Sequence, residues 1–284
     1  MSNGKIKNLA IRATSGAVYA ALMVLATLYP IGMIPLMCFL SVVGLVEFFR
    51  MRGEPSDNLS RNILIVWTVL VYLFFLLGQL SPMIPIGQYQ IFHYFILLFF
   101  FLVIVEIFRK REDSLRYVGA DLFAMFWIVL PMALLTDACL NKAYGGVVLL
   151  SFVLIWINDS FAYMGGSLYG RHKMIERISP NKTWEGTITG IVFTMLASLL
   201  AGYFWAEKIL EQASFHWYGW LLFGLSVAVL ATMGDLLESL LKRQAGVKDS
   251  GRIMPGHGGV LDRMDSILLT AYPVVTFLAI LLML

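Results

Sequence analysis

Long uninterrupted runs of apolar residues constrain the fold more than any other feature of this sequence. Nine such runs lie at residues 16–29, 31–49, 63–80, 91–108, 118–136, 146–166, 187–205, 217–236 and 266–284. Most approach the roughly 20 residues that an α-helix needs to cross a hydrocarbon layer about 30 Å thick. A composition of 59% hydrophobic and 14% charged residues is also far from that of soluble domains. We therefore predict an all-α, polytopic integral membrane protein with about nine transmembrane helices.

The distribution of Lys and Arg predicts how these helices are oriented. If the N-terminus is cytoplasmic and the helices alternate, 19 of the 21 basic residues fall on the cytoplasmic side, and only Lys142 and Lys208 fall outside. Short cytoplasmic loops are enriched in Lys and Arg, so this pattern favours a cytoplasmic N-terminus. We divide the chain into an N-terminal half, residues 1–140, with about five helices, and a C-terminal half, residues 141–284.

The N-terminal half carries few polar residues inside its predicted helices. Its acids Glu47, Glu106 and Asp121 fall close to the proposed cytoplasmic ends, where we expect their side chains to reach water. The C-terminal half differs, because it holds three polar clusters that all map to the cytoplasmic side. We therefore place the functional residues in residues 141–284.

The first cluster begins with Asp159, which lies several residues inside a predicted helix. A carboxylate at that depth is costly unless it faces a cavity, a cation or a partner; a polar contact that joins helices is the alternative. The cluster continues in "GRHKMIERISPNKTWEG", residues 170–186, where "SPNK" can form a turn with exposed amides. An ordinary charged loop would also explain that segment.

The second cluster ends the next-to-last apolar run, in "GDLLESLLKR", residues 234–243. Asp235, Glu238 and Lys242 are spaced three and four residues apart, so they share one helical face. Such a face is usually solvated, but Asp235 follows a long and nearly uncharged run. It should still lie within the membrane boundary and need a partner.

The third cluster is "KDSGRIMPGHGGVLDRMD", residues 248–265. Gly258 and Gly259 allow a backbone to approach a ligand closely, and a helix starting near Gly259 would expose amides that suit phosphate oxygens. Asp262 and Asp265 then lie on one side of that helix, as hard oxygen ligands that suit Mg²⁺. His257, taken alone, is more often structural than catalytic.

Together the three clusters predict a metal-assisted site for a polyphosphate, in which carboxylates hold cations and basic groups neutralise phosphates. The motifs of soluble nucleotide-binding proteins are missing, since neither G-x-x-x-x-G-K-[ST] nor G-x-G-x-x-G is present. Paired His or Cys at the spacing of a zinc site are also missing.

The stretch Ser239 to Asp265 closely resembles the signature of phosphatidate cytidylyltransferases, the CDP-diacylglycerol synthases. That signature reads S-x-x-K-R, four residues, K-D, and then an ending H-G-G-x-x-D-R-x-D. The chain matches it at Ser239, Lys242, Arg243, Lys248, Asp249, His257, Gly258, Gly259, Asp262, Arg263 and Asp265. An upstream "SPNKTWEG" and an Asp-x-x-Ala-Tyr at Asp159 are also similar to the family, whereas Met254 departs mildly from it. The resemblance covers about the last 130 residues.

The resemblance implies transfer of the cytidylyl group of CTP to phosphatidic acid, which gives CDP-diacylglycerol and pyrophosphate and requires Mg²⁺. One or two divalent ions, with a possible monovalent cation, would be held by Asp235, Asp262 and Asp265. These three aspartates, His257 and Lys248 are the expected catalytic residues. The expected substrate-binding residues are Asp159, Ser179, Asn181, Lys182, Glu238, Lys242, Arg243, Asp249, Gly258, Gly259 and Arg263.

The placement of the basic residues and the solubilities of CTP and diacylglycerol chains lead us to expect a multi-pass protein of the bacterial cytoplasmic (inner) membrane with its active site facing the cytoplasm. CTP and phosphatidic acid would be its substrates and the lipid bilayer its surroundings, with no nucleic acid partner and with a homodimer as one possible assembly. Two other functions remain open on the residues alone. One is a Mg²⁺-dependent phosphosugar transferase acting on a polyprenyl phosphate, and the other is a membrane transporter, whose buried polar residues would line a path.

Overall fold

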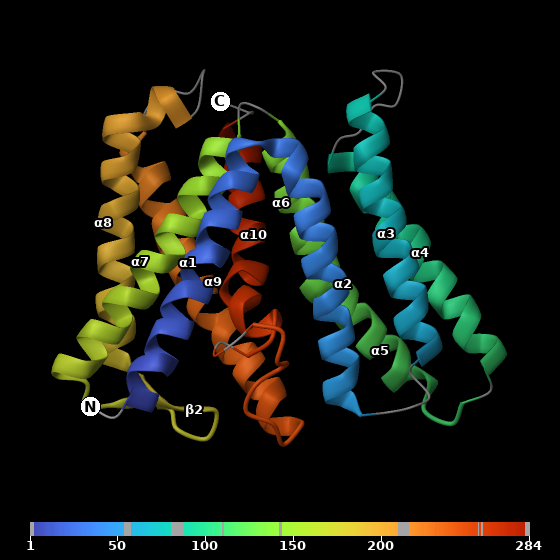
Figure 1. Cartoon of the computed structure of the whole chain (residues 1–284). Helices are drawn as coiled ribbons and strands as arrows, with labels where there is room; N and C mark the ends of the chain where they lie inside the picture. Colours follow the sequence, from blue (N-terminus) through green and yellow to red (C-terminus); the bar gives the residue numbers. More distant parts are fainter. Residues whose placement is uncertain are drawn as a thin grey trace. The chain divides into compact units, whose positions relative to one another are not determined.

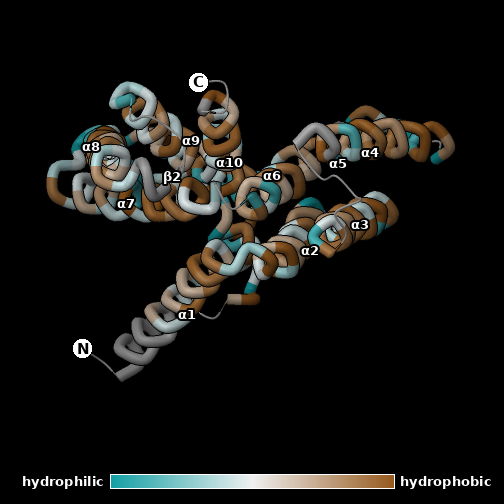
Figure 2. Tube along the Cα trace, turned by 90° about the horizontal axis from the view of Figure 1, so that it is seen from above, coloured by the Kyte–Doolittle hydropathy of each residue, from teal (hydrophilic) through white to brown (hydrophobic). Residues whose placement is uncertain are grey.

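Helices make up nearly all of the computed structural model, which describes residues 3–53, 58–80, 88–109, 111–141, 144–209, 216–254, 256 and 258–281. Within these ranges, eight helical segments are long and apolar enough to cross a membrane, and Figure 2 shows hydrophobic residues along most of their length. The predicted all-α, polytopic class is thereby confirmed. The first predicted run lies in α1 (Asn3–Leu28), whose apolar part Ala13–Leu28 is shorter than the others, so the count of nine stays a prediction.

The chain forms two compact units. Unit 1 consists of Met1–Leu140 and Asp249–Leu261, and unit 2 consists of Asn141–Lys248 and Asp262–Leu284. The segment Asp249–Leu261, which carries the glycines of the third polar cluster, therefore packs with the N-terminal helices.

The described residues of unit 1 form six α-helices. After α1 and a short 3₁₀ turn (Pro30–Gly32) come α2 (Met33–Arg52), α3 (Asn58–Leu80), α4 (Gln88–Arg109), α5 (Ser114–Ala124), a π-helical turn (Met125–Val129) and α6 (Leu130–Leu140). The predicted run 118–136 is the central part of the continuous helical segment Ser114–Leu140. Phe48 of α2 stacks on Phe123 of α5, with 5.8 Å between ring centroids. The hydroxyls of Ser41 and Tyr72 join α2 to α3 at 3.2 Å.

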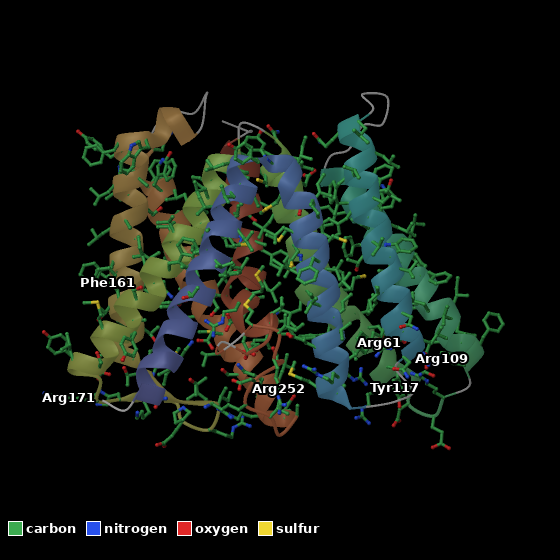
Figure 3. All side chains as sticks on the ribbon, viewed as in Figure 1. Arg61, Arg109, Tyr117, Phe161, Arg171 and Arg252 are labelled. Carbon is green, nitrogen blue, oxygen red and sulfur yellow. The ribbon has the colours of Figure 1, made fainter. Side chains whose placement is uncertain are left out.

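The expectation that the acids of unit 1 reach water is wrong. Glu47, Glu106 and Asp121 are only 1%, 4% and 3% exposed. Glu106 lies 3.6 Å from Arg109 and 3.8 Å from Arg111, so cations on the same helix and in the following loop replace water. Figure 3 shows Arg61, Arg109 and Tyr117 at the same end of the unit. Position near a helix end therefore did not predict exposure, because neighbouring segments cover these ends.

Unit 2 contains α7 (Gly145–Tyr169), the strands β1 (Lys173–Ile175) and β2 (Ser179–Thr183), α8 (Trp184–Ile209), α9 (Trp217–Gln244) and most of α10 (Leu261–Leu281). Figure 1 shows that α7 ends, α8 begins and α9 ends at the same side of this unit, where the two strands also lie.

The predicted turn at "SPNK" is wrong, because these residues form most of β2. β2 pairs antiparallel with β1, with Lys173 opposite Thr183 and Ile175 opposite Ser179. The base of this hairpin is fixed by Glu185, whose carboxylate accepts the backbone N–H groups of Arg171 and His172 at 3.2 Å. The segment is therefore an ordered two-stranded element in an otherwise helical unit.

Close helix contacts through glycine organise unit 2. A side chain at Gly186 of α8 would collide with the carbonyl oxygen of Ala162 on α7, and one at Gly190 would approach the carbonyl oxygen of Asn158 to 2.8 Å. A side chain at Gly234 of α9 would likewise collide with the carbonyl oxygen of Asp265 on α10. Small residues let membrane helices approach closely, and here they bring α8 against α7 and α10 against α9.

Candidate active site

Three carboxylates from α9 and α10 meet inside unit 2. Asp235, Glu238 and Asp265 each offer an oxygen atom, and these atoms all lie within 4.8 Å of one another. The one-turn spacing of Asp235 and Glu238 places both on the same face of α9, and Gly234 allows the backbone of α10 to approach that face. The structure therefore brings together two of the three predicted metal ligands, with Glu238 as the third member of the group.

Asp262 has a different partner in the structure. Its Oδ1 atom accepts a hydrogen bond from Nζ of Lys242 at 2.7 Å, and the same ammonium group contacts Glu238. Lys242 thus links α9 to the first turn of α10. Asp262 lies one helical turn from Asp265, so it borders the carboxylate group.

Lys182 connects the hairpin to the same carboxylates. Its Nζ atom lies 2.7 Å from Oδ2 of Asp235 and 3.4 Å from the carbonyl oxygen of Thr232. The other oxygen of Asp235 accepts a hydrogen bond from the Ser239 hydroxyl at 3.3 Å. Both oxygens of Asp235 are thereby oriented by groups from β2 and α9.

A polar cavity of about 490 Å³ opens beside Asp235, and its volume is in the range typical of small-ligand sites. Asp159 is exposed in this cavity rather than packed between helices, and it interacts electrostatically with Asp235, Lys182 and Arg263. Asn158 of α7, next to it, is buried and donates to the Thr232 hydroxyl of α9 at 3.4 Å. The cavity is lined by Asn158, Asp159, Ala162, Tyr163, Gly166, Ser167, Asn181, Lys182, Thr183, Thr187, Thr232 and Asp235.

The remaining predicted residues that the structure describes fall into three groups. Ser179 lies on the hairpin, and Arg243 donates from α9 to the carbonyl oxygen of Ile178, also in the hairpin, at 3.3 Å. Lys248 and Asp249 are exposed, and Gly258 and Gly259 belong to unit 1. His257 lies outside the described residues, so its predicted role stays a prediction.

Sequence reasoning missed Glu47 as a residue of the third cluster. Its carboxylate accepts the backbone N–H groups of Val260 and Leu261 at 3.1 and 3.0 Å. We expected amides near the start of this helix to suit phosphate, but these two amides are bound by the chain's own carboxylate. The contact spans more than 200 positions of sequence, and an isolated Glu near a helix end gives no signal for it.

Comparison with known proteins identifies the family of this chain. The model of the cytidylyltransferase family matches residues 10–281, which is nearly the full length. The chain belongs to this family. The family predicted from the signature is thereby confirmed, and with it the enzyme class, a cytidylyltransferase.

Named relatives of this cytidylyltransferase occur in several bacteria. A phosphatidate cytidylyltransferase of Rickettsia felis is 37% identical over 179 residues, which cover 62% of this chain and 76% of the relative. A phosphatidate cytidylyltransferase of Haemophilus influenzae is 36% identical over 129 residues, 45% of this chain and 44% of the relative. One of Staphylococcus aureus is 43% identical over 121 residues, 42% of this chain and 44% of the relative.

Proposed function

We propose that this cytidylyltransferase transfers the cytidylyl group of CTP to phosphatidic acid, giving CDP-diacylglycerol and pyrophosphate. The observation that carries the proposal is the group of Asp235, Glu238 and Asp265 beside a polar cavity that also holds Lys182. Carboxylates for a metal, cations for phosphates and a ligand-sized cavity are the parts that such a reaction needs. The names of the relatives support phosphatidic acid as the acceptor.

The residues at this site suit Mg²⁺. Three carboxylate groups whose oxygen atoms lie within 4.8 Å of one another would, when all are ionised, repel by about 3.5 kcal/mol or more for each pair at an effective dielectric constant near 20. Glu238 is fully buried, and its Oε1 atom has no hydrogen-bond partner among the described residues. A hard divalent cation relieves both problems, because Mg²⁺ prefers carboxylate oxygens and takes its remaining ligands from water and phosphate. We propose Asp235, Glu238 and Asp265 as its ligands, with Asp262 as an adjacent acid held by Lys242.

The reaction needs positioning and charge neutralisation more than proton transfer. A phosphomonoester oxygen of phosphatidic acid is ionised near neutral pH, and it attacks the α-phosphorus of CTP while the bond to pyrophosphate breaks. Bound Mg²⁺ would supply positive charge to the phosphates. Lys182 is placed to bind phosphate oxygens in the cavity, while Lys242 holds Glu238 and Asp262 in place. Preorganised groups of this kind lower the barrier because they need no rearrangement as charge develops.

Solubility determines where this chemistry occurs. CTP cannot enter the hydrocarbon layer, and the acyl chains of phosphatidic acid remain in it, so the site must lie at a membrane interface. We propose that this interface is the cytoplasmic face of a bacterial inner membrane, with the N-terminus on the same side, because the basic residues follow that arrangement. A homodimer is compatible with this placement, and its test is the mass of the detergent-solubilised protein.

The decisive experiment is a nucleotide-dependence assay with purified protein in mixed micelles. Labelled CTP with phosphatidic acid and Mg²⁺ should give a lipid-soluble product and pyrophosphate, and EDTA should stop the reaction until Mg²⁺ is restored. A UDP-sugar should not replace CTP, which distinguishes the phosphosugar transferase. Protein in sealed vesicles that moves a solute but forms no labelled lipid would instead indicate the transporter.

A further inference from the structure

Glu47 of α2 is a buried acid outside the carboxylate group described above. Its side chain is 1% exposed, and it accepts three hydrogen bonds. The donors are the Ser250 hydroxyl at 2.9 Å, the Val260 N–H at 3.1 Å and the Leu261 N–H at 3.0 Å. Hydrogen bonds to an ionised acceptor are stronger than those between neutral groups, so this carboxylate is a strong anchor for the segment that it contacts.

The contacted segment is the glycine loop, which we define as residues 250–254, 256 and 258–260. Ser250 begins it, and Val260 ends it directly before α10. Glu47 therefore binds both ends of the loop. Arg50, one helical turn further along α2, donates to the carbonyl oxygen of Ser250 at 2.6 Å. A backbone hydrogen bond from Met254 to Gly258 at 2.9 Å closes the loop internally.

Two glycines permit this contact. A side chain at Gly251 or at Gly259 would collide with the Glu47 carboxylate. Both residues are buried, so each collision would be with packed groups. Gly259 is thus needed for the approach of Glu47, which differs from the ligand approach that the sequence suggested.

Glu47 also serves as the N-terminal cap of α10. The first N–H groups of a helix lack partners within the helix, and an anion there is stabilising. Leu261 is the first residue of α10, and Asp262 and Asp265 follow one and four residues later on that helix. Holding Leu261 therefore fixes the start of the helix that carries both aspartates.

We propose that Glu47 and Arg50 are positioning residues for the cytidylyltransfer reaction. They hold the glycine loop and the first residue of α10 in the geometry that catalysis requires. Displacing reacting groups by about 1 Å can cost on the order of 100-fold in rate. Loosening this anchor should therefore lower kcat much more than it changes substrate affinity.

The principal test is the variant Glu47→Gln in the full-length protein. Its side-chain amide keeps the size of Glu47 but removes the charge and one acceptor oxygen. We expect kcat to fall by about 10- to 100-fold, with KM for phosphatidic acid within about twofold of the wild type. Glu106→Gln is the matched control, because it neutralises another buried acid of unit 1 that pairs with Arg109. Its kcat should stay within about twofold of the wild type.

Because this role rests on the proposed function, a second readout does not need turnover. Hydrogen–deuterium exchange followed by mass spectrometry should show faster exchange in peptides covering residues 249–262 of Glu47→Gln, and unchanged exchange in α3 and α4. Wild-type protein without CTP-dependent activity would refute the proposed function, while the exchange result would still test the anchor.

A second variant covers the case in which Glu47→Gln does not fold. Arg50 is exposed, so Arg50→Ala should fold while losing the contact to Ser250, and it should show the same pattern with a smaller fall in kcat. Normal kcat and normal exchange at residues 249–262 in the variants that fold would overturn the proposal. Equally faster exchange throughout α2 to α6 would also overturn it, because it would indicate a general contribution to stability.

Discussion

Replacing Gly234 by Ala tests whether the close contact between α9 and α10 sets the geometry of the carboxylate group. A Cβ atom at this position would lie 3.1 Å from the carbonyl carbon of Asp265 and 3.2 Å from the Cα atom of Ser266, and it would collide with the Asp265 carbonyl oxygen. Carbon atoms in contact prefer about 3.5–4.0 Å. The backbones must therefore separate by about 0.5–1 Å, a distance that is expected to lower the rate by roughly 10- to 100-fold.

The obstruction cannot be relieved by rotating a side chain, because the atoms that the new methyl group meets belong to the backbone. Overpacking of this kind costs about 1–3 kcal/mol of stability, so Gly234→Ala should still fold. Turnover of CTP in micelles measures the effect on activity. Affinity for Mn²⁺, measured by electron paramagnetic resonance of the free ion, measures the effect on the carboxylates directly. We expect CTP turnover and Mn²⁺ affinity to fall together in Gly234→Ala.

Two other glycines of α9 provide controls. Gly224→Ala also overpacks, since its Cβ atom would lie 2.7 Å from Cβ of Ser198 and 3.0 Å from Cα of Met195 on α8. It lies about 15 Å along the helix from Gly234, so it should lower stability and leave turnover nearly unchanged. Gly219→Ala meets only Phe277 at 3.9 Å and should be neutral. An active Gly234→Ala, or an equal loss of turnover in Gly224→Ala, would refute the reasoning.

Further variants test the individual side chains and the orientation of the chain. Asp265→Asn and Glu238→Gln should abolish Mn²⁺ binding and turnover, whereas Asp262→Asn should retain Mn²⁺ binding because Asp262 lies outside the group of three carboxylates. Loss of Mn²⁺ binding in Asp262→Asn, with binding kept in Glu238→Gln, would make Asp262 the metal ligand instead. Lys182→Met should raise KM for CTP by about 10-fold or more, since hydrogen bonds to charged groups contribute about 1.5–3 kcal/mol, and an unchanged KM would exclude Lys182 from the nucleotide site. Glu176→Cys, made in a background without Cys38 and Cys139, should react with an impermeant maleimide only after the cytoplasmic face is opened; labelling in intact cells would contradict the proposed orientation.

The helical architecture could be predicted from the sequence because each apolar run must satisfy its own backbone inside a membrane. The eight long segments correspond to predicted runs, and the short run at residues 16–29 lies in α1. The hairpin of β1 and β2 was not predicted. Its strands are three and five residues long, and the hydrogen bonds that Glu185 accepts at its base give no periodic signal in the sequence.

The acidic residues of the candidate site were predictable for a related reason. Asp159 and Asp235 stand out because a carboxylate within an apolar run needs a partner, and Asp265 stands out because it lies one helical turn after Asp262 in the third cluster. Helical spacing also placed Glu238 on the face of Asp235, but spacing alone could not choose between Glu238 and Asp262 as the third member of the group. That choice depends on the close approach of α10 to α9 at Gly234, which brings Asp265 beside Asp235 and Glu238.

Glu47 shows why some functional contacts lie beyond sequence reasoning of this kind. It stands near the end of an apolar helix, where an acid is ordinarily solvated, and its partners follow more than 200 residues later. Two of those partners are backbone N–H groups, which every residue except proline possesses, so no residue type marks them. The hydrogen bonds from these N–H groups to Glu47 also change which groups can bind phosphate. Because the amides of Val260 and Leu261 already bind a carboxylate, they are not available to a triphosphate while Glu47 holds them. The negative charge of the triphosphate must then be neutralised by side-chain cations such as Lys182 and by a metal ion. Variants of Lys182 and of the carboxylates that would hold the metal should therefore affect turnover most strongly.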